Sequence, residues 1–333
     1  MNGVKKLAYG IVLSAAVALA GTAQAFVSPG ITINGTKPTK DGTYSGYTYQ
    51  DGVFRLTSAG KTYTFAGQDA SGNVRIEAAA NCTIRLSDGF DLDLSSRPNI
   101  IGETRAQRSP ISLSGNVSVT VQADGEAKLR GGDMGAGVRV VEGQTVYLTS
   151  TGSGILRAYG GSHGAGIGTG YEDSPCGTIY VRGRVFADGG GQACGVGQGN
   201  SGVIGHPSSG GTIIVDDASA DLKALGSYPA AAIGTSSDST GTMNITILDG
   251  KVRAEQYSGY GAAIGTGYSA SGTCNITILG GTVEAIAFQN PKYESGAGIG
   301  AGYWSTATMK ITIAGECKVT AKGGSGSAGI GGG

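Results

Sequence analysis

Apolar and polar residues alternate in short runs along most of this chain. Examples are Val53-Phe54-Arg55-Leu56, Thr83-Ile84-Arg85-Leu86 and Ile276-Thr277-Ile278, and residues such as Gly, Asp and Ser interrupt the runs. Apolar residues two positions apart between turn residues are typical of half-buried β-strands. After the first 25 residues, apolar residues nowhere recur at helical spacing over three turns. We therefore predict an all-β chain with almost no helix.

A glycine-rich phrase recurs at nearly regular intervals. Its fullest form is Gly164-Ala165-Gly166-Ile167-Gly168-Thr169-Gly170-Tyr171. The central Ile or Val of each copy is Val138, Ile167, Val196, Ile233, Ile264, Ile299 or Ile330, and the intervals are 29, 29, 37, 31, 35 and 31 residues. Repeats of this size form stacked arrays, in which each unit buries its apolar face on its neighbours.

Each regular unit contains three short strands, such as Ile276–Ile278, Val283–Ala285 and the phrase around Ile299. Three strands closed by turns make one coil of a parallel β-helix, and successive coils stack about 4.8 Å apart. We predict a single-stranded parallel β-helix with coils of 29 to 37 residues in its regular part. Small residues such as Ala165 and Ala262, together with the central Ile or Val residues, are expected to point inward.

The chain divides into four predicted parts. Residues 1–25 form a signal peptide, 26–45 a leader or cap, 46–134 irregular N-terminal coils, and 135–333 the regular glycine-phrase array. The polar stretch Ser95–Pro110 lies between alternating runs, and the strand pattern resumes unchanged at Ile111. We interpret it as a loop inserted between coils.

The first part has the three regions of a secretory signal. Lys5 and Lys6 precede the apolar run Leu7–Ala20, and Ala23-Gln24-Ala25 offers the small residues of a cleavage site before Phe26. The apolar run is too short for a good membrane anchor, and no second run of spanning length follows. We predict a secreted or cell-surface protein without a transmembrane segment in its mature chain.

Composition narrows the possible partners. Glycine accounts for 63 of 333 residues, but no strict third-position period exists, which excludes collagen. The 24 basic and 24 acidic residues cancel and no basic cluster occurs, so nucleic acid is not an expected partner.

The five cysteines follow the pattern of core residues. Cys82 alternates in phase with Ile84 and Leu86, and Cys274 does so with Ile276 and Ile278. We expect free thiols that act as small buried hydrophobes, rather than a disulfide framework. No Cys and His spacing resembles a zinc site. We expect no cofactor, and calcium stays an alternative that no motif supports.

Three motifs together resemble a known family. They are Tyr49-Gln50-Asp51-Gly52-Val53-Phe54-Arg55-Leu56, Gly154-Ile155-Leu156-Arg157-Ala158-Tyr159-Gly160-Gly161 and the repeated Gly-Ala-Gly-Ile-Gly-x-Gly phrase. The chain resembles, over nearly all of residues 45–333, bacterial exported or surface-displayed repeat proteins with a pectate-lyase-like fold. The resemblance implies a right-handed β-helix and a carbohydrate-binding or adhesin-like role. Because this fold hosts enzymes, adhesins and binding modules, it does not decide the function.

A polysaccharide-degrading enzyme would need two or three carboxylates that converge on one face. The candidates are Asp216 and Asp217 at the end of a predicted strand, with Asp249 one coil later, Arg182 one coil earlier and His206 one loop earlier. The acids and the histidine faintly resemble those of polygalacturonase-like enzymes, but the Asn-x-Asp, Gly-His-Gly and Arg-x-Lys elements are missing. A solvated turn is the favoured interpretation of these acids.

The glycines beside the central Ile, such as Gly168, Gly265 and Gly300, and the alanine Ala263 are expected to face outward. They are explained either by positive φ at a corner of the coil or by the close approach of a ligand. Aromatic residues flank the phrase: Tyr171, Tyr268, Tyr303 and Trp304 follow it, and Tyr159, Tyr228, Tyr257, Tyr260 and Tyr293 precede it. Since sugar rings stack on aromatic rings, we predict a glycan groove with a glycine floor between two aromatic rims. The alternative is that the tyrosines only cover the corner.

The sequence thus predicts an exported, non-enzymatic β-helix repeat protein that binds polysaccharide or a cell-surface glycan. Alternatives are a lyase or glycoside hydrolase on the same fold, or a structural stalk of a larger surface protein. The last phrase runs into Gly331-Gly332-Gly333 with no polar cap. Uncovered strand edges pair readily, so we expect self-association, or a place in a longer or partner-capped assembly.

Overall fold

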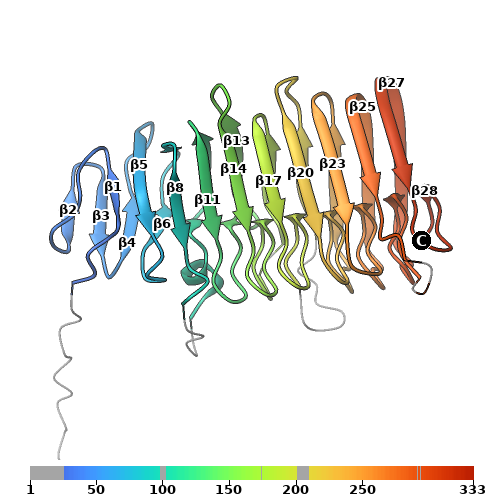
Figure 1. The fold of residues 1–333 in the computed structure, drawn as a ribbon, viewed down its shortest axis with the longest axis horizontal. Helices are drawn as coiled ribbons and strands as arrows, with labels where there is room; N and C mark the ends of the chain where they lie inside the picture. Colours follow the sequence, from blue (N-terminus) through green and yellow to red (C-terminus); the bar gives the residue numbers. More distant parts are fainter. Residues whose placement is uncertain (1–25, 98–102, 174, 201–209, 291, 293) are drawn as a thin grey trace, which may run out of the picture.

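The computed structural model describes residues 26–97, 103–173, 175–200, 210–290, 292 and 294–333 (Figure 1). The predicted signal peptide, residues 1–25, lies outside the described residues. The described part is all-β, with long parallel sheets that are compatible with a β-solenoid. Its helix content is a single 3-10 turn, η1 (Arg105–Arg108). The prediction of an all-β chain with almost no helix is confirmed for this part of the chain.

The larger sheet combines two ladders of parallel strands. The first ladder contains β7 (Cys82–Leu86), β10 (Ser118–Ala123), β13 (Thr145–Ser150), β16 (Thr178–Val181), β19 (Gly210–Val215) and β22 (Thr242–Ile247). The second contains β8 (Phe90–Asp93), β11 (Glu126–Arg130), β14 (Ile155–Tyr159), β17 (Arg184–Asp188), β20 (Asp221–Gly226) and β23 (Lys251–Gln256). The long strands β25 (Thr273–Ile286) and β27 (Thr308–Lys322) belong to both ladders, so the two ladders count as one sheet.

The second sheet is the third ladder, and the copies of the glycine phrase form its strands from β12 onward. It contains β4 (Val53–Leu56), β6 (Arg75–Ala78), β9 (Ile111–Leu113), β12 (Val138–Arg139), β15 (Ile167–Gly168), β18 (Val196–Gly197), β21 (Ile233–Gly234), β24 (Ile264–Gly265), β26 (Ile299–Gly300) and β28 (Ile330–Gly331). Each central Ile or Val pairs with its counterpart in the next coil, as Ile264 does with Ile299. The repeat in the sequence is therefore a repeat in space.

The core lies inside the coils. Alternate residues of each strand are fully buried, as Ile179 and Val181 are in β16. Equivalent apolar residues pair in register from coil to coil, for example Ile213, Ile245 and Ile276. Stacked side chains of similar size fill such an interior without voids.

All five cysteines are free, as predicted, and four of them are buried. Burial raises the pKa of the Cys82 thiol to about 11 and those of Cys176 and Cys274 to about 12. Cys317 is half-buried because it lies in the last coil. The buried thiols therefore behave as small hydrophobes rather than as reactive groups.

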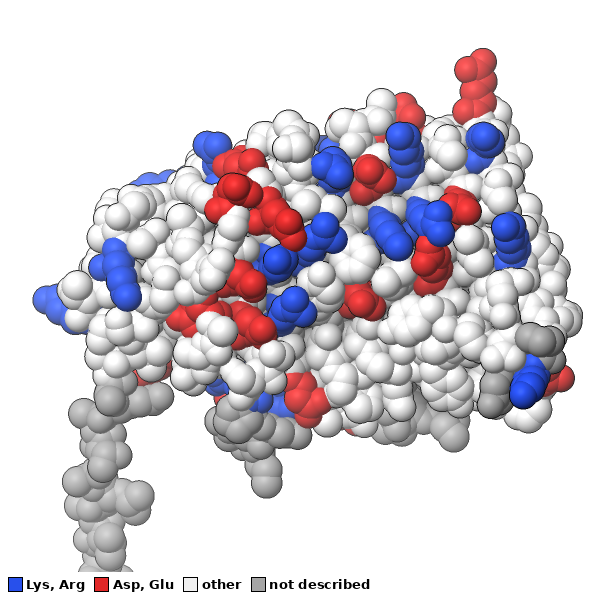
Figure 2. Space-filling model, viewed as in Figure 1, with Lys and Arg blue, Asp and Glu red and all other residues white. Residues whose placement is uncertain are grey.

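The outer face of the second ladder carries charges of both signs (Figure 2). Ion pairs join neighbouring coils, with Arg157 Nε 3.0 Å from Glu126 Oε1 and Arg253 Nη1 2.8 Å from Glu284 Oε2. Exposed pairs of this kind contribute little to stability. Their consequence is that the charges of this face are neutralised in pairs.

The two ends of the stack differ. At the N-terminal end, β1 (Ile31–Ile33) pairs antiparallel with β5 (Thr62–Asp69), and β2 (Gly42–Tyr44) and β3 (Tyr47–Gln50) extend the third ladder, each pairing antiparallel with the next strand. At the other end, Ile330 is 48% exposed, whereas its counterpart Ile299 is fully buried. The last coil therefore presents apolar interior side chains to solvent.

Candidate functional site

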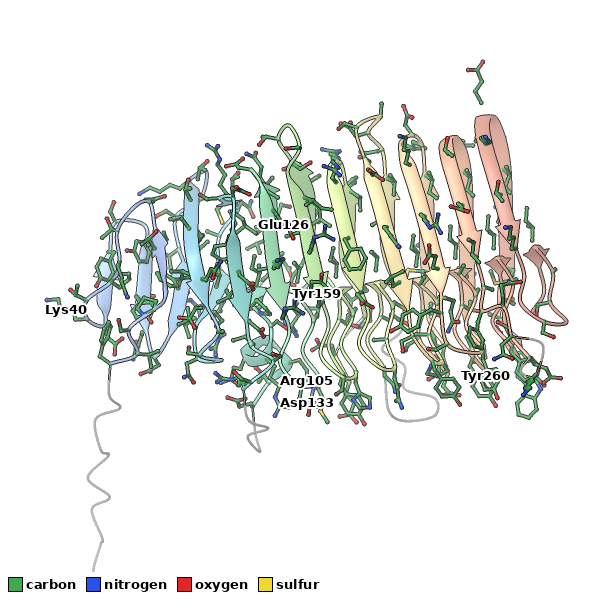
Figure 3. The ribbon with its side chains drawn as sticks, viewed as in Figure 1. Lys40, Arg105, Glu126, Asp133, Tyr159 and Tyr260 are labelled. Atoms are coloured by element: carbon green, nitrogen blue, oxygen red, sulfur yellow. The ribbon has the colours of Figure 1, made fainter. Side chains whose placement is uncertain are left out.

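Aromatic side chains of three successive coils gather along one edge of the molecule, where Tyr260 is labelled in Figure 3. We call this group the aromatic strip. It consists of Tyr228, Tyr260, Tyr268, Tyr303 and Trp304. Tyr260 lies 5.3 Å from Tyr268 and 5.4 Å from Tyr303, between ring centroids. Trp304 is 65% exposed and Tyr228 43%, so the strip offers accessible ring surface.

The backbone explains why these rings meet. Tyr268 and Tyr303 each follow the glycine phrase, and the next residue, Ser269 or Trp304, has a φ of 55° or 56°. The left-handed residue turns the chain at that point. The N–H of Tyr303 then donates to the carbonyl of Tyr260 at 2.7 Å, which ties the loop after one phrase to the loop before the previous one.

Tyr268 and Tyr303 stand side by side as predicted, with ring centroids 6.3 Å apart. The predicted separation into two rims is wrong, because Tyr260 from the preceding loops contacts both of them directly. Burial raises the pKa of Tyr268, and a hydrogen bond to the Glu294 carboxylate raises that of Tyr303. Both phenols therefore stay protonated in neutral solution.

Tyr171 occupies the same position after its own copy of the phrase. Its ring centroid lies 5.2 Å from that of His163 and 5.2 Å from the Arg105 guanidinium, and Arg105 Nε donates to the Tyr171 carbonyl at 2.6 Å. Burial, and next the charge of Glu172, raises the pKa of Tyr171. A hollow of about 310 Å³ that His163, Tyr171 and Tyr228 line separates Tyr171 from the aromatic strip.

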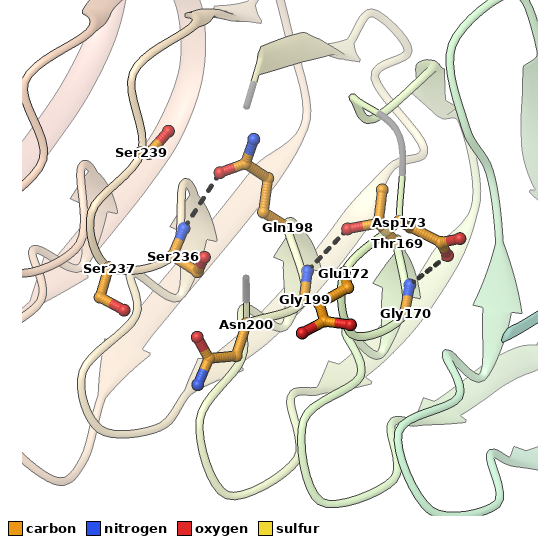
Figure 4. A pocket seen from close by; sticks show the side chains of 10 residues that line it. All are labelled: Thr169, Gly170, Glu172, Asp173, Gln198, Gly199, Asn200, Ser236, Ser237 and Ser239. Carbon is orange, nitrogen blue, oxygen red and sulfur yellow. Dashed lines mark hydrogen bonds between the residues drawn. The ribbon is translucent and has the colours of Figure 1, made fainter. Parts of the chain in front are cut away.

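A polar network holds the loops beside this hollow (Figure 4). Asp173 accepts two hydrogen bonds from Arg139, at 2.7 and 2.8 Å, and one from the N–H of Gly170 at 2.8 Å. The Thr169 hydroxyl oxygen accepts from the N–H of Gly199 in the next coil at 2.8 Å. Bonds of this kind cross from coil to coil, so the loop that carries Tyr171 is fixed to its neighbours.

The glycines of the phrase do not lie on the surface of the molecule. Gly168, Gly265 and Gly300 are buried, with φ of 138°, 140° and 140°. A Cβ atom on Gly168 would lie 1.8 Å from the carbonyl oxygen of Gly197, and one on Gly265 would lie 1.9 Å from that of Gly300. The expectation of an outward-facing glycine floor is therefore wrong. Glycine is needed here because the next coil passes where a side chain would begin.

The neighbouring alanines also depart from the prediction. Ala262 is buried but lies outside the main core, whereas Ala263, expected to face outward, is part of it. The third strand has only two residues in each regular coil, which is too short for alternation to continue beyond it.

The remaining predicted aromatics lie elsewhere. The Tyr159 ring sits on the outer face of β14 between the Arg130 guanidinium, at 4.4 Å, and the Phe186 ring, at 5.6 Å (Figure 3). Tyr257 is 46% exposed, and burial of its hydroxyl raises its pKa. Tyr293 lies outside the described residues. Tyr159 therefore contacts groups of both flanking strands, β11 and β17.

The described candidate catalytic residues make separate local contacts rather than one shared network. Arg182 binds Asp216 through two hydrogen bonds of 2.9 and 2.7 Å, and its guanidinium also lies over the rings of Tyr147 and Tyr180. Asp217 accepts hydrogen bonds from Ser219 within a turn, and Asp249 accepts one from the N–H of Gly250. His206 lies outside the described residues. This is the geometry of an ion pair and two turns.

One polar constellation was not predicted. The Ser162 hydroxyl donates to Asp133, one coil earlier, and lies 2.8 Å from His163 Nδ1. In a nucleophilic triad the carboxylate binds the imidazole, whereas here it binds the hydroxyl. Only the coil register, which pairs residues 29 positions apart, could have revealed Asp133 as a neighbour.

Within the described ranges, no three His, Cys, Asp or Glu side chains gather as a metal ion would require. The same residues include no helix of the length and apolarity that would cross a bilayer. No protein-family model, curated protein or solved structure matches this chain. The function is therefore argued from the geometry of the chain itself.

Proposed function

We propose that this protein is an exported, non-enzymatic, single-stranded right-handed parallel β-helix that binds polysaccharide or a cell-surface glycan through the aromatic strip. The observation that supports the proposal is the contiguity of the strip. Five rings from three coils lie within 6.3 Å of a neighbour, between centroids, and the outermost ring is 65% exposed. Exposed apolar surface of this kind marks a binding site more often than chance.

The orientation of the strip suits a linear glycan. Coils repeat about every 4.8 Å along the stack, so a chain lying parallel to the axis would meet rings from successive coils. The C–H faces of sugar rings stack on aromatic faces, while phenol hydroxyls and the indole N–H keep contact with water. Tyr268 and Tyr303, one coil apart, would contact neighbouring parts of the same glycan.

The test removes two rings of the strip. Tyr268→Ala with Tyr303→Ala should weaken retention on a glycan panel by about tenfold, since each aromatic contact contributes about 0.5–1.5 kcal/mol beyond its buried area. The fold should survive because both rings are outside the core. The matched control is Tyr147→Ala with Tyr180→Ala, which removes two stacked tyrosines of adjacent coils on another face.

The same panel distinguishes the alternatives. Retention without new reducing or unsaturated ends supports a binding protein, and release of such ends would establish a hydrolase or lyase instead. Full retention by a folded Tyr268→Ala, Tyr303→Ala variant would show that the tyrosines only cover the corner. Absence of retention on every glycan by the parent protein would favour the structural stalk.

A further inference from the structure

The hollow of about 310 Å³ beside the aromatic strip is lined by rings, neutral polar groups and one carboxylate. Tyr171 and Tyr228 supply rings, and Gln192 and Asn200 supply side-chain amides that bond to each other. Among the described lining residues, Asp238 is the only Asp or Glu, and none is Lys or Arg. The hollow has the size of a small-molecule pocket, and its lining is negative as long as His163 is neutral.

The backbone holds Asp238 at the corner that Ser269 and Trp304 occupy in the next two coils. Its φ is 56°, and its N–H donates to the Tyr268 carbonyl at 2.9 Å. The half-buried side chain, by contrast, has no hydrogen bond or ion pair with any residue that the structure describes. The position of this carboxylate is therefore fixed by the main chain, while its charge is left without a partner there.

The carboxylates of the neighbouring loop are paired. Glu172, at the equivalent corner two coils earlier, has its Oε2 atom 3.7 Å from Arg105 Nη2. Asp173 accepts two hydrogen bonds from Arg139. Within the described ranges the chain thus supplies a cation to each of these acids and none to Asp238. A cation from outside the chain would complete the hollow, since opposite charges attract more strongly where water is partly excluded.

Another face of the protein shows a cation bound by rings and a carboxylate together. The Arg182 guanidinium lies 4.9 Å from the ring centroid of Tyr147 and 5.0 Å from that of Tyr180. It also donates to Asp216 at 2.7 Å. In the hollow, the Tyr228 ring and the Asp238 carboxylate are both present, but no described guanidinium or ammonium group lies over that ring.

We propose that the hollow binds an organic ammonium group, which pairs with the Asp238 carboxylate and lies against the Tyr228 ring. The face of an aromatic ring attracts ammonium groups, including quaternary ones. Two sources carry such a group: a small free amine such as choline, and an amino sugar within a glycan. The second source rests on the proposed function. It adds that the glycan carries protonated amines, because Tyr228 belongs to both the hollow and the aromatic strip.

The experiment titrates the mature chain calorimetrically with choline, the hexamer of glucosamine and the hexamer of N-acetylglucosamine. Asp238→Asn should weaken binding of the two ammonium probes by about tenfold, because it removes a charge-assisted contact, and should leave the acetylated hexamer unaffected. The fold should survive, since Asn adopts positive φ as Asp does. Asp51→Asn is the matched control, because Asp51 is also left-handed, with φ of 50°, and exposed at a turn remote in the stack.

Each pattern of loss has one meaning. Weaker binding of both ammonium probes by Asp238→Asn supports a site open to either source. A loss confined to the glucosamine hexamer assigns an amino-sugar site, and a loss confined to choline assigns a site for a small quaternary ammonium compound. Unchanged binding by Asp238→Asn, an equal loss with Asp51→Asn, an equal loss of the acetylated hexamer, or a parent protein that binds neither ammonium probe would overturn the inference.

The tyrosine variant keeps the two proposals apart. If Tyr268→Ala with Tyr303→Ala abolishes retention of the acetylated hexamer while Asp238→Asn changes no affinity, the strip stands and the ammonium site falls. If Asp238→Asn weakens choline binding in a protein that retains no glycan, the ammonium site stands and the proposed function falls.

Discussion

Gly265 shows how a single residue controls the approach of two coils. Its φ of 140° lies in a region that other residues rarely adopt, and a Cβ atom there would lie 1.9 Å from the Gly300 carbonyl oxygen. The cost of a side chain therefore has two parts, one from the backbone conformation and one from the displaced coil. Because the loop beside Gly265 carries Tyr268, the same residue also positions the strip.

We expect Gly265→Ala to reduce the free energy of unfolding by about 3 kcal/mol or more, through strain and displacement of the next coil. Gly89→Ala is the control for the conformational part, because Gly89 also has a positive φ, of 72°, but has no atom within 4 Å of a built Cβ. Urea denaturation measures both variants. Equal losses would mean that the close approach of the coils contributes nothing.

Asp188 predicts a dependence of stability on pH. Burial raises its pKa to about 6 against the opposing charge of Lys223, and one of its oxygens has no hydrogen-bond partner within the described residues. Because the pKa of Asp188 is higher in the folded than in the unfolded protein, the protonated carboxyl group contributes to stability. This contribution is complete below about pH 4 and is lost as the pH rises through about 6.

Asp188→Asn should therefore be more stable than the parent at pH 7, by about 1 kcal/mol once solvent screening is allowed for, and the difference should close at pH 4. Urea midpoints at the two pH values measure it. A difference that stays the same at both values would show that Asp188 ionises normally.

At the scale of the elements, strands and register could be predicted, whereas the corner could not. Alternation is local, and the repeated phrase sets equivalent residues opposite each other, as Ile264 and Ile299 are. The corner depends on Ser269 and Trp304, non-glycine residues at positive φ that no sequence pattern marks. The merging of the two predicted aromatic rims follows from this corner, because Tyr260 contacts both Tyr268 and Tyr303.

The loop after β15 depends on one buried ion pair, since the side chain of Asp173 is 7% exposed and that of Arg139 is 14% exposed. Asp173→Ala should lower the free energy of unfolding by about 3 kcal/mol, because Arg139 would keep a buried charge without its partner. Adding Arg139→Met should recover part of this loss. A double-mutant cycle in urea checks it, and strictly additive losses would contradict it.

At the scale of the whole molecule, the two ends of the stack differ in how they are covered. Antiparallel strands cover the first coils, whereas Ile313 and Ile330 of the last coil are 38% and 48% exposed. An apolar edge with unpaired backbone groups is a template for another strand. The edge strands at the N-terminal end, β1 and β2, have three residues each and run antiparallel to their neighbours, so we expect contact between copies to join two C-terminal ends.

We therefore predict that residues 26–333 associate at tens of micromolar, and that Ile311→Lys with Ile313→Lys restores a monomer. Leu279→Lys is the control, because Leu279 is 42% exposed but lies in β25, which the last coil already covers. Sedimentation velocity measures the three proteins. A parent protein that stays monomeric over this range would refute the prediction.

The antiparallel strands at the N-terminal end also imply an order of assembly. The contacts of β2, β3 and β4 join residues close together in the sequence, so they can form before the rest of the chain is available. Every later coil, by contrast, adds its strands to a coil that precedes it. In a chain that emerges amino terminus first, the N-terminal strands can fold before the later coils are available. Each later coil can then pair its strands with the edge of the coil already formed. The direction of synthesis and the direction of growth coincide in this architecture.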